Sequence, residues 1–93
     1  MKTGAELIAI EREEQIYIHG RTIEYDVENN EFSQLSYAAE CLITDDPHNE
    51  IGAPHGWSSQ LWTRMKNKSY KERLIIAGAL IAAEIDRLNY TGN

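Results

Sequence analysis

Apolar residues recur at helical spacing in three long segments of this 93-residue chain, and turn-forming residues separate these segments. The clearest stripe lies in residues 31–44, where five apolar side chains fall on one side of a helix. They are Phe32, Leu35, Ala39, Leu42 and Ile43. Similar spacing predicts helices over residues 4–19 and 70–89. The pattern therefore predicts an all-α fold: a compact bundle of three main helices plus one short helix, in a single domain of residues 1–93.

Two of these helices carry a start signal. In the stretch TGAE, Thr3 stands three residues before Glu6, and in SYKE, Ser69 stands three residues before Glu72. A Ser or Thr at this distance from a Glu forms a capping box, in which each side chain bonds the backbone N–H of the other residue. Gly20 is expected to end the first helix, because glycine accepts the left-handed conformation that follows many helices.

The connections between the long helices are predicted to be mostly irregular. Residues 20–30 alternate briefly between polar and apolar positions, which indicates an extended connection, with a short strand as the alternative. Pro47 is expected to end the second helix, since proline cannot continue one. Residues 45–57 are predicted to be loop, and residues 58–65, SSQLWTRM, are predicted to form the short helix.

The predicted inward side of the first helix is partly polar. Leu7, Ile8 and Ile18 define an apolar arc, and the polar residues within or beside it are Glu11, Arg12, Glu14 and Gln15. An inward polar group needs a partner, because leaving it unsatisfied costs about 1–3 kcal/mol. Two explanations stay open. The polar side chains form a structural network with an Arg of the third helix, or they line a polar pocket between helices.

The third helix is apolar around its whole circumference from residue 74 to residue 83. A helix of this kind is either central to its domain or shared with another subunit. Because so short a chain offers little protein to surround it, we expect a homo-oligomer that assembles through this helix. A central helix, packed by loops and by the tryptophan-containing segment, is the alternative.

The distribution of charge narrows the class of partner. The formal net charge is −6, yet five of the nine Lys and Arg residues lie between positions 64 and 73. An acidic body disfavours duplex nucleic acid, whereas a local cationic patch suits a small anion. The longest apolar run, LIIAGALIAA, is shorter than the ~20 residues of a membrane span, and the N-terminal sequence lacks the pattern of a signal peptide. We therefore expect a cytoplasmic protein without a membrane partner.

Both tryptophans, Trp57 and Trp62, lie in the stretch GWSSQLW, directly before this basic run. An aromatic face can stack a nucleobase, which is worth about 1–3 kcal/mol per base. Cationic side chains beside the helix start at Ser69 can hold a phosphate. The combination predicts a nucleotide-like anionic ligand. The predicted binding residues are Trp57, Trp62, Arg64, Lys66, Lys68, Lys71 and Arg73, together with Arg12, Glu11 and Gln15 of the first helix.

Each part of this prediction has a structural alternative. A tryptophan often covers a small core, and a basic run can be a solvated surface. We expect a division of roles, in which one ring binds and the other closes the core.

Catalytic motifs are absent from the sequence: it contains no phosphate-binding loop and no dinucleotide-binding fingerprint. His19, His48 and His55 do not have the spacing of metal ligands. A magnesium site would need several carboxylates from neighbouring helices, since Mg²⁺ prefers oxygen ligands. The candidates are Glu11, Glu14 and Glu40. We therefore predict no catalytic residue, no metal and no other cofactor.

Four stretches together resemble a family of small phage and prophage proteins. They are ELIAIEREEQIYIHG, LSYAAECL, the tryptophan-containing segment and AGALIAAEIDRL, and they cover most of the chain. Their order is also similar to that of the MazG-type nucleotide pyrophosphohydrolases, which are all-α, oligomeric and bind Mg²⁺ through an acidic motif. This chain departs from that motif, because the second helix offers only Glu40 and the third has no carboxylate before Glu84.

The resemblance implies nucleotide binding in the cytoplasm of a bacterial host, without hydrolysis. It leads to the hypothesis of a phage-type protein that sequesters a small nucleotide-derived ligand. Such a sponge would remove a host immune signal, for example a cyclic dinucleotide or an ADP-ribose derivative. One alternative is a reduced MazG-like pyrophosphohydrolase that depends on magnesium. The other is an interaction module that binds a host protein.

Overall fold

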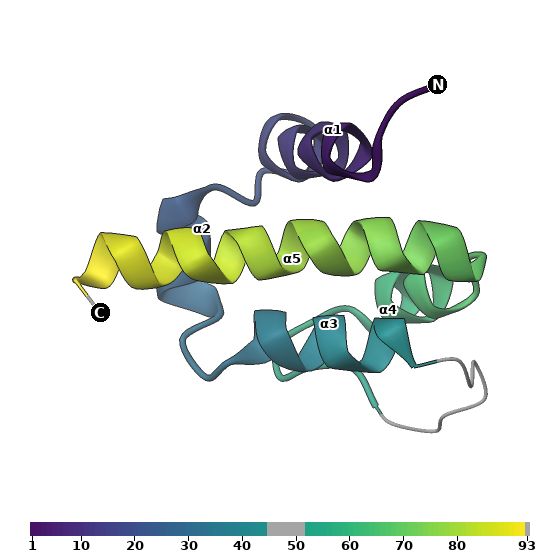
Figure 1. The fold of residues 1–93 in the computed structure, drawn as a ribbon. Helices are drawn as coiled ribbons and strands as arrows, with labels where there is room; N and C mark the ends of the chain where they lie inside the picture. Colours follow the sequence, from purple (N-terminus) through teal and green to yellow (C-terminus); the bar gives the residue numbers. More distant parts are fainter. Residues whose placement is uncertain (45–51, 93) are drawn as a thin grey trace.

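A computed structural model of the protein describes residues 1–44 and 52–92. These residues contain five helices. They are α1 (Gly4–Tyr17), α2 (Ile23–Asn29), α3 (Gln34–Ile43), α4 (Ser59–Lys66) and α5 (Tyr70–Thr91) (Figure 1). The described residues contain no strand, so the predicted all-α fold is confirmed. Pro47 and His48 lie outside these residues.

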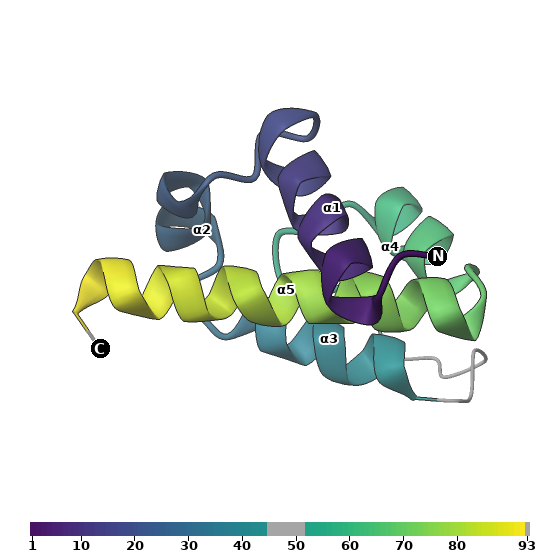
Figure 2. The same ribbon diagram turned by 45° about the horizontal axis from the view of Figure 1, so that its top comes forward.

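The long helix α5 is the centre of the arrangement. It contacts α1, α2 and α3. In the view of Figure 1, α1 lies above α5 and α3 lies below it, while α2 passes behind its C-terminal half. Figure 2 shows that α1 crosses α5 steeply, and that α4 lies near the N-terminal end of α5. None of the helices within the described ranges is long and apolar enough to cross a membrane.

The core lies between α3, α4 and α5. Its main members are Leu35, Ala38, Ala39, Leu42, Trp62, Met65, Ile76, Ala77, Leu80 and Ala83. Burying a large aliphatic side chain contributes about 1.5–3 kcal/mol, so these contacts account for much of the stability. Two members of the predicted stripe are corrected: Phe32 and Ile43 are exposed. Phe32 precedes the first residue of α3, so the helical spacing does not apply to it.

Side-chain caps begin α1 and α5, and of the two predicted capping boxes the one at α1 is complete. Thr3 Oγ1 accepts the backbone N–H of Glu6 at 3.1 Å, and the Glu6 carboxylate accepts the backbone N–H of Thr3 at 3.1 Å, which completes the capping box. At α5, Ser69 Oγ accepts the backbone N–H of Glu72 at 3.2 Å. A cap of this type is worth about 1 kcal/mol.

The extended connection expected in residues 20–30 is wrong, because α2 occupies most of it. Thr22 begins this helix, and its hydroxyl accepts the backbone N–H of Tyr25 at 3.1 Å. The apparent alternation contains Ile23 and Val27, which are four residues apart and therefore share one face of a helix. Both are partly buried, whereas Tyr25 between them is exposed.

Helix α5 is central to the fold, which is the alternative that its apolar circumference left open. Three helices cover most of it, and Ile8 of α1 packs so closely on Gly78 that an added Cβ would lie 2.6 Å from its Cδ1. Three large side chains nevertheless stay uncovered. Leu74, Ile81 and Ile85 are 39%, 46% and 54% exposed. We call these three residues the α5 stripe.

Candidate functional site

Two neighbouring cavities lie where α1, α4 and the segment before α4 meet. The first, of about 220 Å³, is enclosed by the C-terminal half of α1, by Leu61 and Met65 of α4 and by Lys68. We call it the α1–α4 cavity. The second, of about 270 Å³, is bounded by Trp57 and Tyr25, and we call it the Trp57 cavity. Arg21 and Leu61 line both, so the two cavities adjoin.

The α1–α4 cavity receives three polar side chains of α1: Glu11, Glu14 and Gln15. Gln15 is buried, and its Nε2 donates to Oε2 of Glu11 at 3.3 Å. Burial raises the pKa of Glu11, because a partly desolvated carboxylate loses hydration, although the bond from Gln15 opposes this rise. Glu11, Glu14 and Gln15 therefore line a pocket. A polar pocket was one of the two explanations that the sequence left open for the inward side of this helix.

Arg12 follows the other explanation, a structural network. Its Nη2 pairs with Oδ2 of Asp86 in α5 at 3.3 Å, and its Nη1 donates to the backbone carbonyl of Arg21 at 3.3 Å. The side chain is buried and lines neither cavity. The network thus joins an Arg of α1 to an acid of α5, whereas the network expected from the sequence joined Glu11 or Gln15 to an Arg of the third helix.

Arg21 is the residue that sequence reasoning missed. Gly20 adopts φ +69°, and the backbone N–H of Arg21 then donates to the carbonyl of Gln15 at 2.8 Å. This turn brings residue 21 back toward the end of α1. The Arg21 guanidinium lies 5.4 Å from the centroid of the Trp57 ring, which is a cation–π contact. A cation directly after a helix-ending glycine was the sequence signal that could have identified it.

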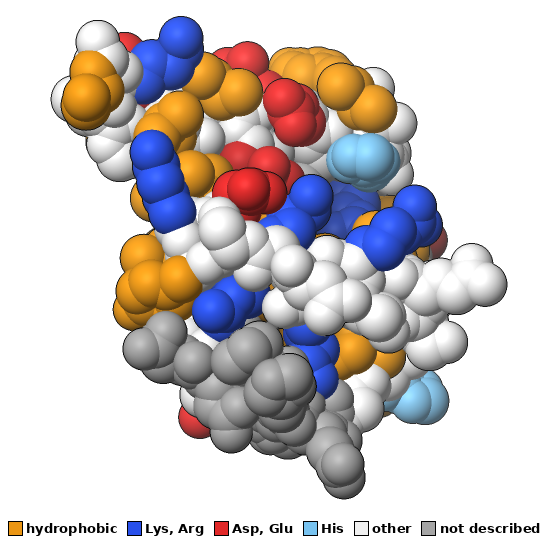
Figure 3. Space-filling model, turned by 90° about the vertical axis from the view of Figure 1, so that its right-hand side faces the viewer, with side chains coloured by type: hydrophobic (Ala, Val, Ile, Leu, Met, Phe, Trp, Pro, Cys, Tyr) orange, Lys and Arg blue, Asp and Glu red, His pale blue; other side chains and the backbone are white. Residues whose placement is uncertain are grey.

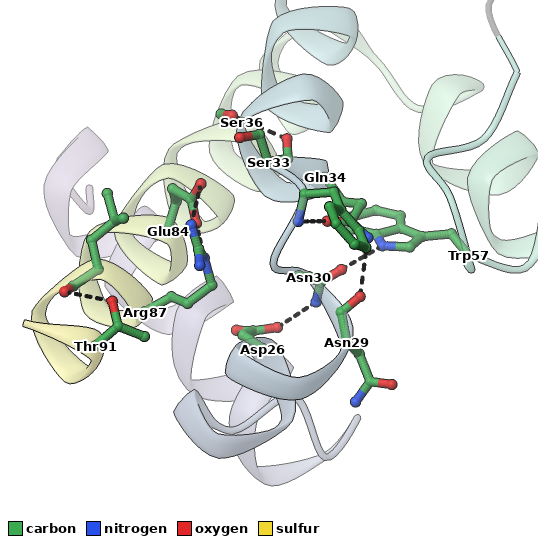
Figure 4. Close-up of polar contacts among 12 residues, drawn as sticks. Asp26, Asn29, Asn30, Ser33, Gln34, Ser36, Trp57, Glu84, Arg87 and Thr91 are labelled. Atoms are coloured by element: carbon green, nitrogen blue, oxygen red, sulfur yellow. Dashed lines mark hydrogen bonds and ion pairs between the residues drawn. The ribbon is translucent and has the colours of Figure 1, made fainter. Parts of the chain in front are cut away.

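Trp57 forms one wall of its cavity in a fixed orientation. Its Nε1–H donates to Oδ1 of Asn30 at 2.8 Å, as Figure 4 shows. Its ring meets the Trp62 ring edge to face, with centroids 6.1 Å apart. Trp57 is half-buried and reaches the cavity.

Trp62 lies in the core and is 3% exposed. Lys66 Nζ lies 6.0 Å from the centroid of its ring. The predicted role of Trp62 as a stacking surface is therefore corrected: the ring is covered by protein because it lies on the buried side of α4, next to Met65. This arrangement matches the expected division between the two tryptophans, while ligand binding by Trp57 stays a prediction.

Arg73 also has a structural position. It is buried, and its Nη1 donates to the backbone carbonyls of Leu42 and Thr44, at the end of α3. Carbonyl groups at a helix end have no partner within the helix, so a cation there stabilises them. Arg73 thus joins α5 to α3 and lines neither cavity, which corrects its predicted contact with a ligand.

The other basic residues of the run spread over one end of the molecule. Figure 3 shows Lys and Arg side chains across this end, next to acidic side chains and a histidine. Lys68 lines the α1–α4 cavity and pairs with Glu72 at 3.8 Å. Arg64 borders a separate shallow depression on α4, and Lys71 is exposed on α5. Of the five predicted cations, the structure brings Lys68 to the cavities.

The start of α5 differs from the phosphate site expected there. Ser69 Oγ accepts the backbone N–H of Glu72, and the same hydroxyl donates to Oε1 of Glu72 at 3.2 Å. The cap and a negative charge occupy the position that a phosphate would need.

The carboxylates of the alternative magnesium site are not brought together. Glu11 and Glu14 line the α1–α4 cavity, whereas Glu40 lines an open groove beside α3, on the opposite side of α5. In the described part of the chain, no group of three His, Cys, Asp or Glu side chains could hold a metal ion.

The groove beside α3 is larger, at about 510 Å³, and is lined by Phe32, Tyr37, Glu40 and His55 among others. The Phe32 and His55 rings meet edge to face, 6.5 Å apart. Among the described residues that line this groove, the acidic one is Glu40, whose carboxylate would repel an anion. The α1–α4 cavity also holds the carboxylates of Glu11 and Glu14, but its walls carry the cations Arg21 and Lys68 as well, and the described lining of the groove has no Lys or Arg.

No protein-family model, curated protein or solved structure matches this chain. The geometry of the two cavities is therefore what bears on the function of this chain.

Proposed function

We propose that this protein binds a small nucleotide-derived anion in the α1–α4 cavity and the Trp57 cavity, without hydrolysing it. The observation that supports this most is the sharing of Arg21 and Leu61 by both cavities. Either cavity alone is smaller than the ~300–1,000 Å³ of most small-molecule sites, but the adjoining pair reaches that range.

The lining suits the parts of a nucleotide. Arg21 and Lys68 would hold the phosphate, since both are cations at the cavity walls. Gln15 and Glu11 offer an amide and a carboxyl group, which can bond both donors and acceptors at the edge of a base. The Trp57 ring, which lines the second cavity, would offer an aromatic surface for stacking.

Sequestration without turnover is the form of binding that we favour. A reduced MazG-like site would use Glu11, Glu14 and Glu40, but Glu40 lines a different cavity from the other two. The resemblance to phage proteins suggests that the ligand is a host signal. Cyclic dinucleotides and ADP-ribose derivatives are therefore the first compounds to test, and the cytoplasm of a bacterial host is the proposed location.

Calorimetric titration with cyclic dinucleotides and ADP-ribose species tests this proposal. We expect one compound to bind with micromolar or tighter affinity, and Lys68→Ala or Arg21→Ala to weaken it about tenfold or more. Arg64→Ala is the matched control, because Arg64 borders a different depression on α4. Equal weakening by Arg64→Ala, or no compound that binds at micromolar concentration, would contradict the proposal.

Self-association is a second function, which the exposed α5 stripe favours. Leu74, Ile81 and Ile85 share one face and span about 17 Å of helix. Lys71 lies at the N-terminal end of that face, while the last turn of α5 holds no basic residue to balance the negative end of the helix dipole. An antiparallel second copy would bring its Lys71 to that end, so we propose a second copy as the occupant.

A further inference from the structure

A chain of hydrogen bonds leads from the buried side of α2 to the Trp57 ring (Figure 4). Nε1–H of Trp57 donates to Oδ1 of Asn30 at 2.8 Å, and Nδ2–H of Asn30 donates to Oδ1 of Asp26 at 2.7 Å. Asp26 and Asn30 are 1% and 2% exposed. Because Asp26 and Asn30 are buried, their hydrogen bonds are electrostatically stronger than they would be on the surface.

The chemistry of the three groups fixes the direction of the Asn30 amide. An indole N–H can only donate and a carboxylate can only accept, so Asn30 must turn its oxygen to Trp57 and its NH₂ group to Asp26. The reversed amide would place donor against donor and acceptor against acceptor. Asp26 therefore determines, through Asn30, which bond the indole can make.

This arrangement does not depend on the charge of Asp26. Its Oδ2 has no hydrogen-bond partner among the described residues and is the oxygen that can carry a proton. Oδ1 then accepts from Asn30 in both charge states. A neutral amide at position 26 would preserve the same acceptor, which makes Asp26→Asn a conservative substitution.

The backbone near Trp57 is held separately. Gln34 Nε2 donates to the carbonyl of Asn29 at 3.1 Å and to that of His55 at 3.4 Å. The backbone N–H of Trp57 donates to the carbonyl of Pro54 at 3.0 Å. These contacts join the segment before α4 to the α2–α3 turn. The direction of the Trp57 side chain is left to its contacts with Asn30, Trp62 and Arg21.

We infer that Asp26 and Asn30 are positioning residues, which hold the Trp57 ring at the cavity wall and so set ligand affinity without touching the ligand. The inference rests on the proposed function, since a ligand in the Trp57 cavity is what the ring would meet. It also bears on selectivity. Because Asn30 uses the indole N–H, Trp57 contributes stacking, and selection among bases belongs to Gln15 and Glu11.

Tryptophan fluorescence tests the inference without a ligand. In a Trp62→Phe background the emission reports Trp57 alone. Asn30→Ala and Asp26→Ala are each expected to shift this emission to longer wavelength and to increase its quenching by acrylamide, because the ring loosens. Asp26→Asn is expected to restore the spectrum of the background. Asn29→Ala is the matched control, since the Asn29 side chain donates to the carbonyl of Tyr25 in α2.

An Asp26→Ala spectrum equal to that of the background would overturn the inference, because Asp26 would then have no influence on the ring. If Asp26→Ala fails to fold by circular dichroism, exchange of the Trp57 indole N–H in the unsubstituted protein decides the matter. We expect this exchange to be slower than in free indole, because the N–H is hydrogen-bonded to Asn30. Exchange at the free rate would overturn the inference.

Titration with ADP-ribose as the probe completes the test. We expect about tenfold weaker binding to Asn30→Ala, with Asp26→Asn and Asn29→Ala unchanged. Equal affinity of Asn30→Ala and the unsubstituted protein would overturn the effect on binding. Absence of binding to every variant would count against the proposed function, while the fluorescence result would still decide whether Asp26 and Asn30 position the ring.

Discussion

Glu11 lies in the wall of the α1–α4 cavity, so its charge would affect an anion bound there. Burial raises its pKa, so it stays protonated to a higher pH than an exposed glutamate. Above that pKa its negative charge repels an anionic ligand. We therefore expect affinity for an anionic ligand to increase as the pH falls through the pKa of Glu11.

Calorimetry at a series of pH values, on the unsubstituted protein and on Glu11→Gln, checks this prediction. Glu11→Gln is expected to bind more tightly at neutral pH and to remove most of the pH dependence. Glu13→Gln, which alters an exposed residue of the same helix, is the control. A loss of affinity in Glu11→Gln at neutral pH would show that the carboxylate is an attractive contact.

Asp26 leads to a prediction on stability. Burial raises its pKa, with the bond from Asn30 acting in the opposite direction. The folded protein therefore binds a proton that the unfolded chain has released, at pH values between the ordinary aspartate pKa and the raised one. The free energy of unfolding should fall as the pH rises through this window.

Urea unfolding at several pH values measures this effect. Asp26→Asn cannot titrate, so its free energy of unfolding should change less across the same window. The other charged groups near Asp26 are the same in the unsubstituted protein and in Asp26→Asn. They are Arg12, Arg21, Glu84 and Arg87. Glu28→Gln, on the exposed side of α2, is the control. An unchanged pH dependence in Asp26→Asn would contradict the assignment.

At the residue scale, the sequence pointed to the right region but not to the right contacts. Trp57, Gln15 and Lys68 reach the cavities as the residue types suggested. Arg73 and Trp62 do not, because a cation can complete a helix end and a tryptophan can fill a core equally well. Which of these roles a side chain takes depends on the packing of distant segments, which spacing along the chain does not encode.

The connection between α2 and α3 contains a strained residue. Ser33 adopts φ +65° and is the one non-glycine with positive φ in the described residues. Its side chain makes no cap hydrogen bond to α3. A left-handed conformation costs a non-glycine residue about 1–2 kcal/mol.

Ser33→Gly should therefore raise the free energy of unfolding by up to about 1 kcal/mol, because it relieves the left-handed strain. Part of this gain is offset because glycine increases the conformational entropy of the unfolded chain. Urea unfolding monitored by circular dichroism measures it. Ser36→Gly, inside α3, should instead lower the free energy of unfolding, because glycine is unfavourable in a helix interior. A decrease for Ser33→Gly would show that Ser33 is not strained.

At the element scale, local signals predicted four of the five helices. The caps at Thr3 and Ser69 and the stripe of α3 act over one or two turns, so sequence contains them. Helix α2 was missed because seven residues fit a short alternation as well as a helix. Contact of α2 with α5 favours the helix, and such a contact cannot be deduced from a short segment.

The whole molecule leaves the α5 stripe open to a partner. A specific interface covers about 800 Å² on each side, which is more than three side chains provide, so a second copy must also contact the flanks of α5. Light scattering over a range of concentrations should detect a dimer. Ile81→Lys should dissociate it, because a charge would then be buried in the centre of the interface.

Phe32→Lys, in the groove beside α3, is the control for this experiment and should leave the dimer intact. A monomer at every concentration would contradict self-association. In that case the α5 stripe would be available to a different protein, as in the interaction-module hypothesis.

The central claim is that a nucleotide-derived anion binds between α1, α4 and Trp57. The most direct measurement is a titration of the ¹⁵N-labelled protein with ADP-ribose, followed by NMR, because the chain has two distinguishable indole N–H groups. We predict that the indole signal of Trp57 and the side-chain amide of Gln15 shift, while the indole of Trp62 changes little. Shifts centred on Tyr37 and His55, or on the α5 stripe, with the Trp57 and Gln15 signals unchanged, would contradict the account.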